Sequence, residues 1–179
     1  VHMLGLDLKE SVIAKCNATA AKYGYDCLAF QVQDINTYQF AGEIDLVIAL
    51  HACDTATDTV LFNALRWQAK LIFSVPCCQH ELNGQMKSES ILMRYGIVKE
   101  RVASLMTDAI RANLLEACGY RTQLLEFIEL EHTPKNILIR AVRTNRKGSP
   151  ALMDEVESLM NQFNLSPTLY RLLKQADMI

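Results

Sequence analysis

The feature that most constrains this chain is an alternation of short apolar runs with segments of helical spacing. The apolar runs that predict strands lie at residues 3–8, 27–32, 44–50 and 71–75. Apolar residues recur at helical spacing over residues 11–23, 55–68 and 98–118. This alternation predicts an α/β fold in which helices cover both faces of a mostly parallel sheet, with the runs at 3–8 and 44–50 buried.

The C-terminal part of the chain departs from this alternation. Residues 124–130 and 137–142 predict two strands joined by a tight segment, which is typical of an antiparallel hairpin. Residues 81–96 are polar and irregular, with a short helix expected near their end. Two amphipathic helices, at 151–163 and 168–176, follow a polar linker.

Composition indicates an ordinary globular protein of one domain's length. Of its 179 residues 50% are hydrophobic and 21% charged, and the net charge is -2. This balance excludes a strong overall attraction to nucleic acid or to an anionic membrane. No apolar run reaches the length of a membrane span, so no membrane partner is expected. Six cysteines in a chain of this length do not indicate a small disulfide-stabilised protein, and we expect a cytoplasmic, reduced location.

Polar side chains follow the predicted strands where each strand ends. Ligands of such sheets bind outside the carboxyl ends of the strands. The polar groups at these positions are Asp7, Asp34, residues 51–54, residues 76–80 and, in the hairpin, residues 132–136. We therefore expect them to converge on one edge of the sheet.

Four of these strand ends carry recognisable motifs. They are Gly5-Leu-Asp7-Leu-Lys9, His51-Ala-Cys-Asp54 followed by Ala56-Thr-Asp58, Pro76-Cys-Cys78 with His80-Glu-Leu82, and His132-Thr-Pro-Lys-Asn136. In this order they resemble class I S-adenosylmethionine-dependent methyltransferases from their second strand onward, in the branch with a Pro-Cys-Cys motif after the fifth strand. The resemblance covers residues 1–143 and rests on the four motifs together, because each alone is a weak signal.

The resemblance implies a Rossmann-like sheet that lacks its front end. Class I methyltransferases begin with a central strand and a glycine-rich loop around the methionine part of the cofactor, and neither occurs in this sequence. We expect a partial domain at residues 1–146 and a helical extension at 147–179 that packs on it. A gap should lie between the strands at 3–8 and 44–50, leaving an exposed edge through which this fragment self-associates. By itself it should be inactive and bind the cofactor poorly.

The resemblance also implies S-adenosylmethionine as the cofactor. Asp7 is expected to accept hydrogen bonds from the ribose hydroxyls, as acids do in nucleotide-binding sheets. Asp34 is expected to meet the adenine amino group, with Ile35 packed on the ring. The expected cofactor-binding set is Asp7, Leu8, Asp34, Ile35, Leu50 and His51. Two structural alternatives stay open: Asp7 as an acid at a helix N-terminus, and Asp34 in an Asx turn.

The expected catalytic residues are His51, Asp54, Cys77 and Cys78. Methyl transfer depends mainly on aligning the acceptor with the methyl group, so His51 or Asp54 would act as a base only for a protonated acceptor. The Asn-Pro-Pro-Tyr type of motif, found in relatives that act on planar amines, is absent, so an exocyclic amine acceptor is not indicated.

Some of the charged residues have simpler structural interpretations. Asp54 could cap the helix that follows it. Asp108 and Arg111, three positions apart on one helix, are expected to form an intrahelical ion pair.

Cys77 and Cys78 have three interpretations. They could line the acceptor pocket, they could be small buried hydrophobic residues, or they could form a zinc or thiol site with Cys53 or nearby histidines. Adjacent cysteines rarely bind one ion and no second paired-ligand motif occurs, so no metal is expected. The expected substrate-binding residues are Pro76, His80, Lys135 and Asn136.

The sequence thus predicts methyl transfer from S-adenosylmethionine to RNA or protein. A methyltransferase-like module that binds a partner without activity is one alternative. A zinc- or thiol-dependent enzyme on a Rossmann-like sheet is another.

Overall fold

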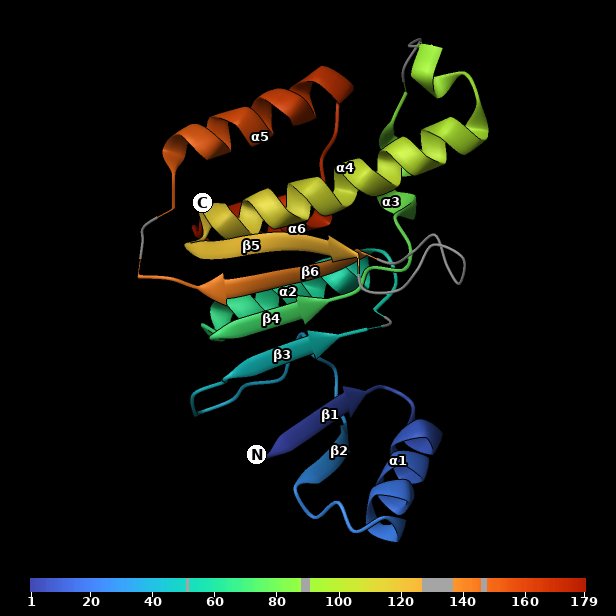
Figure 1. Ribbon diagram of the computed structural model, residues 1–179, viewed down its shortest axis with the longest axis vertical. Coiled ribbons are helices and arrows are strands. Elements are labelled where there is room, and N and C mark those ends of the chain that lie inside the picture. Colours follow the sequence, from blue (N-terminus) through green and yellow to red (C-terminus); the bar gives the residue numbers. More distant parts are fainter. Residues whose placement is uncertain (51, 88–90, 127–136, 146–147) are drawn as a thin grey trace. The chain divides into compact units, whose positions relative to one another are not determined.

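The computed structural model describes residues 1–50, 52–87, 91–126, 137–145 and 148–179 (Figure 1). The chain forms two compact units, residues 1–41 and residues 42–179.

The first unit is a parallel strand pair joined by one helix. Strands β1 (Met3–Asp7) and β2 (Leu28–Val32) pair in parallel, and α1 (Glu10–Lys22) connects them. Ile13 and Ala20 are the buried residues of α1. The Asn17 side chain on the same helix both donates to and accepts from the backbone of Phe30, each at 3.0 Å. This side chain therefore forms hydrogen bonds with the N–H and carbonyl of Phe30, which lie on the side of β2 away from β1.

Gly5 is required by the way β1 lies against β2. It pairs with Phe30 across the two strands. A Cβ atom at position 5 would overlap the Phe30 ring. Only glycine leaves room for that ring, so the packing of β2 explains the first residue of the Gly5-Leu-Asp7 motif.

The second unit contains a four-stranded sheet. Its strands, in the order in which they lie side by side, are β3 (Leu46–Ala49), β4 (Leu71–Ser74), β6 (Ile137–Arg143) and β5 (Tyr120–Glu126). β3 and β4 are parallel, and β6 is antiparallel to both β4 and β5. Every strand of this sheet except β6 therefore runs in the same direction. The mostly parallel sheet with a C-terminal antiparallel hairpin is confirmed; the hairpin tip at 127–136 lies outside the described residues.

Helices pack on one face of this sheet. They are α2 (Thr55–Arg66), α3 (His80–Gln85), α4 (Gly96–Ala117), α5 (Pro150–Phe163) and α6 (Thr168–Gln175), with a 3₁₀ turn at Ile91–Met93. Figure 1 shows α4 running along β5, and α5 packs on α4 while α6 packs on α2. The core between helices and sheet contains fully buried Leu61, Ile72, Leu114, Ile139 and Leu169. No helix in the described part of the chain is long and apolar enough to cross a membrane.

The opposite face of this sheet differs from the prediction. Side chains alternate between the two faces of a strand. Ala49 of β3 is buried toward the helices, whereas Leu46 and Ile48 are 39% and 52% exposed on the other face. Within the described residues of this unit no helix covers that face, so the expectation of a fully buried run at 44–50 was wrong.

The run at residues 3–8 is also less buried than predicted. Met3 and Leu4 are 48% and 40% exposed, and Leu8 is 68% exposed. The physical reason is that the first unit has only α1 to cover its two strands. Met3 and Leu4 point to opposite faces of β1, so one helix and one partner strand enclose neither face fully.

The helix α3 was not predicted, because its stabilisation is not local. Gln79, at its N-cap position, makes no side-chain hydrogen bond to it. Instead Oδ1 of Asp54 accepts a hydrogen bond from the Glu81 backbone N–H at 3.0 Å. Leu82 and Met86 then bury the apolar side of this short segment. A cap supplied from 27 positions away leaves no signature in the sequence around residue 80.

The C-terminal helices are fixed to the unit through Glu81. Its carboxylate accepts hydrogen bonds from the Thr168 backbone N–H at 2.9 Å and from the Thr168 hydroxyl at 2.7 Å. It also pairs with Arg171 at 3.0 Å. The N-terminus of α6 thus receives an acidic cap from α3. The boundary between a sheet domain and an extension at residue 146 stays a prediction.

We predict that the uncovered strand β3 promotes self-association of the 179-residue chain. Among the described residues β3 pairs only with β4, which leaves unpaired backbone groups beside exposed Ile48. Ile48→Lys should shift the chain toward monomer in sedimentation velocity, because a charge opposes burial of that edge. Leu105→Lys, at a 59% exposed apolar position on α4, is the matched control. An equal shift in both variants would refute a specific role for β3.

Candidate functional site

The strand ends of the first unit place two carboxylates at one end of the strand pair. Asp7 ends β1, and Asp34 follows β2. The Gln33 backbone N–H donates to the Asp7 carbonyl at 3.0 Å, so the two strand ends remain in contact beyond the regular pairing. Both acids therefore lie at the carboxyl end of the parallel pair, where ligands of such sheets bind.

Local turns fix the orientation of these two carboxylates. Oδ1 of Asp7 accepts a hydrogen bond from the Lys9 backbone N–H at 2.8 Å. Oδ1 of Asp34 accepts from the backbone N–H and the side-chain amide of Asn36, at 2.8 and 2.9 Å. The Asx turn considered for Asp34 is therefore present. Such a turn orients a carboxylate as well as stabilising the loop, so it does not exclude a ligand.

Apolar side chains accompany the acids. Leu8 follows Asp7 and is 68% exposed, and Ile35 next to Asp34 is half-buried. In the second unit Leu50, directly after β3, is 52% exposed. His51, expected both to bind the cofactor and to act in catalysis, lies outside the described residues.

The second unit is organised around the guanidinium of Arg111, which is 2% exposed. Its Nε and Nη2 donate to the two carboxylate oxygens of Asp58 on α2, at 3.0 and 2.7 Å. Its Nη1 donates to Asp108 at 3.2 Å, which is the predicted intrahelical pair. Its Nη2 also donates to the Asp54 carbonyl at 2.9 Å. The Arg111 network, comprising Arg111, Asp58, Asp108 and the Asp54 carbonyl, thus joins two helices and the loop after β3.

The same network reaches the loop after β4. Nε2 of Gln79 donates to Oδ2 of Asp108 at 3.1 Å, and both side chains are buried. Burial raises the pKa of Asp58, and the hydrogen bond and charge of Arg111 oppose that rise. Burial by itself would lower the pKa of Arg111, but its bonds to Asp58 and Asp108 raise it, so the guanidinium stays charged. Loops from two strand ends are therefore tied to one buried cation.

Asp54 has an unusual backbone and a tertiary role. Its φ is 52° and its ψ -122°, in a region that favours glycine. The side chain makes no cap hydrogen bond to α2, which it precedes, and instead bonds the Glu81 N–H. Non-glycine residues keep such a conformation only where surrounding contacts impose it. Here the Arg111 and Glu81 contacts supply that constraint.

Three thiols gather between the two loops. The Sγ atoms of Cys53 and Cys77 are 3.1 Å apart, and those of Cys53, Cys77 and Cys78 all lie within 4.8 Å of one another. The hydrogen bond with Cys53, followed by burial and Cys78, raises the pKa of Cys77 to about 12. Without a ligand Cys77 is therefore a neutral thiol near pH 7, which does not favour a nucleophilic role. Cys77 and Cys78 are half-buried, so they are not plain core residues.

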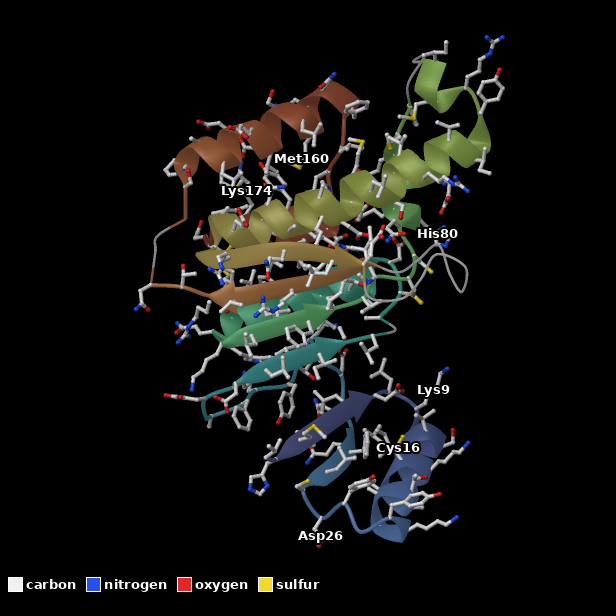
Figure 2. The ribbon with its side chains drawn as sticks, viewed as in Figure 1. Lys9, Cys16, Asp26, His80, Met160 and Lys174 are labelled. Carbon is white, nitrogen blue, oxygen red and sulfur yellow. The ribbon has the colours of Figure 1, made fainter. Side chains whose placement is uncertain are left out.

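The expected substrate-binding residues are only partly described. Pro76 is buried between β4 and the cysteines, and His80, labelled in Figure 2, is the exposed first residue of α3. Lys135 and Asn136 lie outside the described residues. Within the second unit, the structure thus brings Asp54, Cys77, Cys78 and Pro76 to one end of the sheet and leaves His80 exposed at the start of α3.

Sequence reasoning placed Asp58 in a motif and Gln79 in a polar cluster but assigned neither its role in the buried network. A signal for Asp58 was available, because Arg111 stands among apolar residues of α4 and a charged residue on such a face requires a buried partner. Gln79 gave no such signal. A separate hollow of about 440 Å³, lined by Tyr120, Arg121 and Thr144 among others, lies at the opposite end of the sheet and contains none of the expected site residues.

We predict that Arg111→Ala lowers the free energy of unfolding by about 3–5 kcal/mol, because it leaves two carboxylates buried without their cation. Arg101→Ala, at an exposed position of the same helix, should change it by less than about 0.5 kcal/mol. Urea denaturation followed by circular dichroism measures both.

The pH dependence of the free energy of unfolding lost in Arg111→Ala tests the cause of that loss. Asp58 already has a raised pKa, and losing Arg111 raises it further. A carboxyl with a raised pKa in the folded state penalises folding at neutral pH. That penalty disappears as the pH falls toward the ordinary Asp value of 3.8. The difference between wild type and variant should therefore shrink in acid, and a constant difference would contradict this explanation.

Comparison with known proteins bears on the family. Residues 1–85 match the profile of a family described as a methyltransferase domain. The human glutathione S-transferase C-terminal domain-containing protein is 26% identical over 135 residues, which cover 60% of this chain and 21% of the human protein. The chain therefore spans about a fifth of the length of the curated relatives it matches.

Two solved structures share the fold. A candidate rRNA-methylase from Clostridium thermocellum superposes with a TM-score of 0.52 and 11% identity, over 82% of this chain and 74% of the other. The 23S rRNA methyltransferase ErmE does so with a TM-score of 0.52 and 13% identity, over 95% of this chain and 66% of the other. Residues 1–85 are thus similar to the methyltransferase-domain family, and the chain has the Rossmann-like fold of class I methyltransferases.

Proposed function

We propose that this chain serves in methyl transfer from S-adenosylmethionine to RNA. The observation that carries the proposal is the family match of residues 1–85, which contains both acids at the carboxyl end of the β1–β2 pair. A protein that binds the cofactor and RNA without transferring the methyl group is the alternative that the experiments must separate.

The chemistry of the first unit fits the nucleoside part of this cofactor. A carboxylate only accepts hydrogen bonds, and ribose hydroxyls and the adenine amino group donate them. Asp7 is exposed and Asp34 half-exposed, and each is oriented by a turn through Oδ1. Leu8 and Ile35 offer apolar surface beside them. We assign the ribose to Asp7 and the adenine to Asp34 and Ile35, with Leu8 as a packing contact.

The second unit is assigned to the acceptor. When bound, S-adenosylmethionine supplies an electrophilic methyl group on a positively charged sulfur. Such a transfer needs an acceptor held in line more than it needs acid or base groups. The loops after β3 and β4 are fixed by the Arg111 network, so Asp54, Cys77, Cys78 and Pro76 are held in place. In this proposal they position the acceptor, and Leu50 contacts the cofactor.

RNA is the acceptor class that we favour. Both solved structures described above carry rRNA methylation in their names. The net charge of -2 means that binding cannot rest on an overall electrostatic attraction. Recognition would then depend on local contacts, with His80 a candidate for stacking on a base. We also propose a cytoplasmic location, consistent with six cysteines and no expected disulfide framework.

The cofactor assignment predicts a specific loss of affinity. Asp7→Ala should weaken S-adenosylmethionine binding by about tenfold to a hundredfold, because hydrogen bonds to a charged group are removed. Saturation-transfer difference NMR is suited to the measurement, since it detects weak binding. The control is Asp26→Ala, because Asp26 (Figure 2) is exposed and precedes β2, at the other end of that strand from Asp34. Unchanged binding by Asp7→Ala would remove the ribose assignment.

The acceptor assignment predicts where RNA contacts the chain. Photocrosslinking with 4-thiouridine-containing ribosomal RNA should label peptides that contain residues 76–85. Unlabelled RNA should compete, and a crosslink confined to the hollow near Arg121 would contradict the assignment. With S-adenosylmethionine labelled by tritium in its methyl group, transfer of tritium to RNA would identify an RNA methyltransferase. Transfer of tritium to protein would instead identify protein as the acceptor. Cofactor and RNA binding without transfer identifies the binding module.

A further inference from the structure

The three thiols of Cys53, Cys77 and Cys78, here called the cysteine cluster, come from two loops that leave the same end of the sheet. β3 and β4 are parallel neighbours, with Ala49 opposite Ser74. Cys53 follows β3, while Cys77 and Cys78 follow β4. Parallel pairing therefore brings together cysteines that are 24 positions apart in the chain.

The sulfur spacing suits a single metal ion. Three thiolates at the usual zinc–sulfur distance in tetrahedral geometry lie about 3.8 Å from one another. The sulfurs of the cluster lie within 4.8 Å of each other, with the Cys53–Cys77 pair at 3.1 Å. An ion would widen that pair by about 0.7 Å, from the same geometry. Exposed Cys53 has the freedom to make this movement and leaves an entry path.

The backbone next to each cysteine loop is already fixed. Asp54 directly follows Cys53. Its carbonyl accepts a hydrogen bond from Arg111, and its carboxylate accepts one from the Glu81 backbone N–H. Gln79, directly after Cys78, is bonded to Asp108. A metal site binds more tightly when such outer contacts orient its ligands before the ion arrives. The Arg111 network supplies that preorganisation without contributing a ligand.

We propose that Cys53, Cys77 and Cys78 bind one zinc ion, with the fourth coordination position open to solvent or to an acceptor atom. On binding, each thiol gives its proton to solvent and forms one sulfur–zinc bond. The resulting centre carries a net charge of about -1, from three thiolates and one divalent cation. The proposal stands on the cluster and is independent of methyl transfer.

Cobalt(II) is the probe that tests the site. The metal-free 179-residue chain, kept in a non-thiol reductant, is titrated with Co²⁺, and thiolate-to-cobalt charge-transfer absorption is recorded. We expect saturation at one ion per chain and displacement of the signal by Zn²⁺. Elemental analysis of the zinc-loaded protein should give the same stoichiometry.

Single substitutions identify the ligands. Cys53→Ser, Cys77→Ser and Cys78→Ser should each weaken cobalt binding by at least about a hundredfold, because a three-ligand site cannot spare one. Cys27→Ser and Cys118→Ser are the matched controls; Cys27 is exposed, like Cys53, and Cys118 is half-buried, like Cys77. Both controls should bind cobalt as the wild type does, and circular dichroism checks that each variant is folded.

Two results would overturn the proposal. One is a folded Cys53→Ser variant that binds cobalt as tightly as wild type. The other is no binding by the reduced chain, combined with a Cys53–Cys77 disulfide found by mass spectrometry once the reductant is removed. That second result would assign the short sulfur–sulfur contact to a redox pair. Neither result bears on cofactor binding by Asp7, so failure here leaves the proposed function standing.

Discussion

The buried guanidinium of Arg111 is the interaction on which the second unit depends. It neutralises Asp58 and Asp108 in the core and bonds the carbonyl of Asp54. Burying one cation with two anions costs desolvation energy, and apolar residues of the same volume would often serve stability as well or better. Stability alone therefore does not account for this network. Its distinctive result is positional: two helices and the loops after two neighbouring strands are held in one arrangement.

The two units orient their candidate site residues in different ways. In the first unit Asp7 and Asp34 are oriented by turns within two residues of themselves. In the second unit Asp54 and Gln79, the residues next to Cys53 and to the Cys77–Cys78 pair, are held by contacts from α3 and α4. Locally held groups tolerate changes elsewhere in the fold, whereas the loops of the second unit depend on residues far away in sequence. The unusual φ of Asp54 fits this view, because only tertiary contacts can hold it.

The parts of the fold that periodicity controls were predictable. Strands β1 to β4, the long helix α4 and the antiparallel β5–β6 pair all follow from apolar runs and spacing. Burial was less predictable, because an apolar run does not say whether a helix covers both faces; Ile48 is exposed for that reason. The helix α3 and the contacts of Gln79 rest on distant partners, which no local pattern encodes. For the cysteines, sequence spacing showed only the adjacent pair Cys77 and Cys78, and it therefore argued against a shared metal ion. The third cysteine, Cys53, comes close to them because β3 pairs with β4.

The position of the cysteine cluster links the two proposals through a constraint on charge. A carboxylate at Asp54 and three neighbouring thiols occupy one end of the sheet, with the Arg111 cation committed to the core. An acceptor that approaches this end as an RNA strand brings further negative charge. The raised pKa of Cys77 means that this thiol keeps its proton and adds no negative charge. With a zinc ion bound, the centre has a net charge of about -1 in place of the -3 of three bare thiolates. Protons or a metal ion on the sulfurs would therefore reduce the negative charge that the proposed RNA acceptor meets at the loops after β3 and β4.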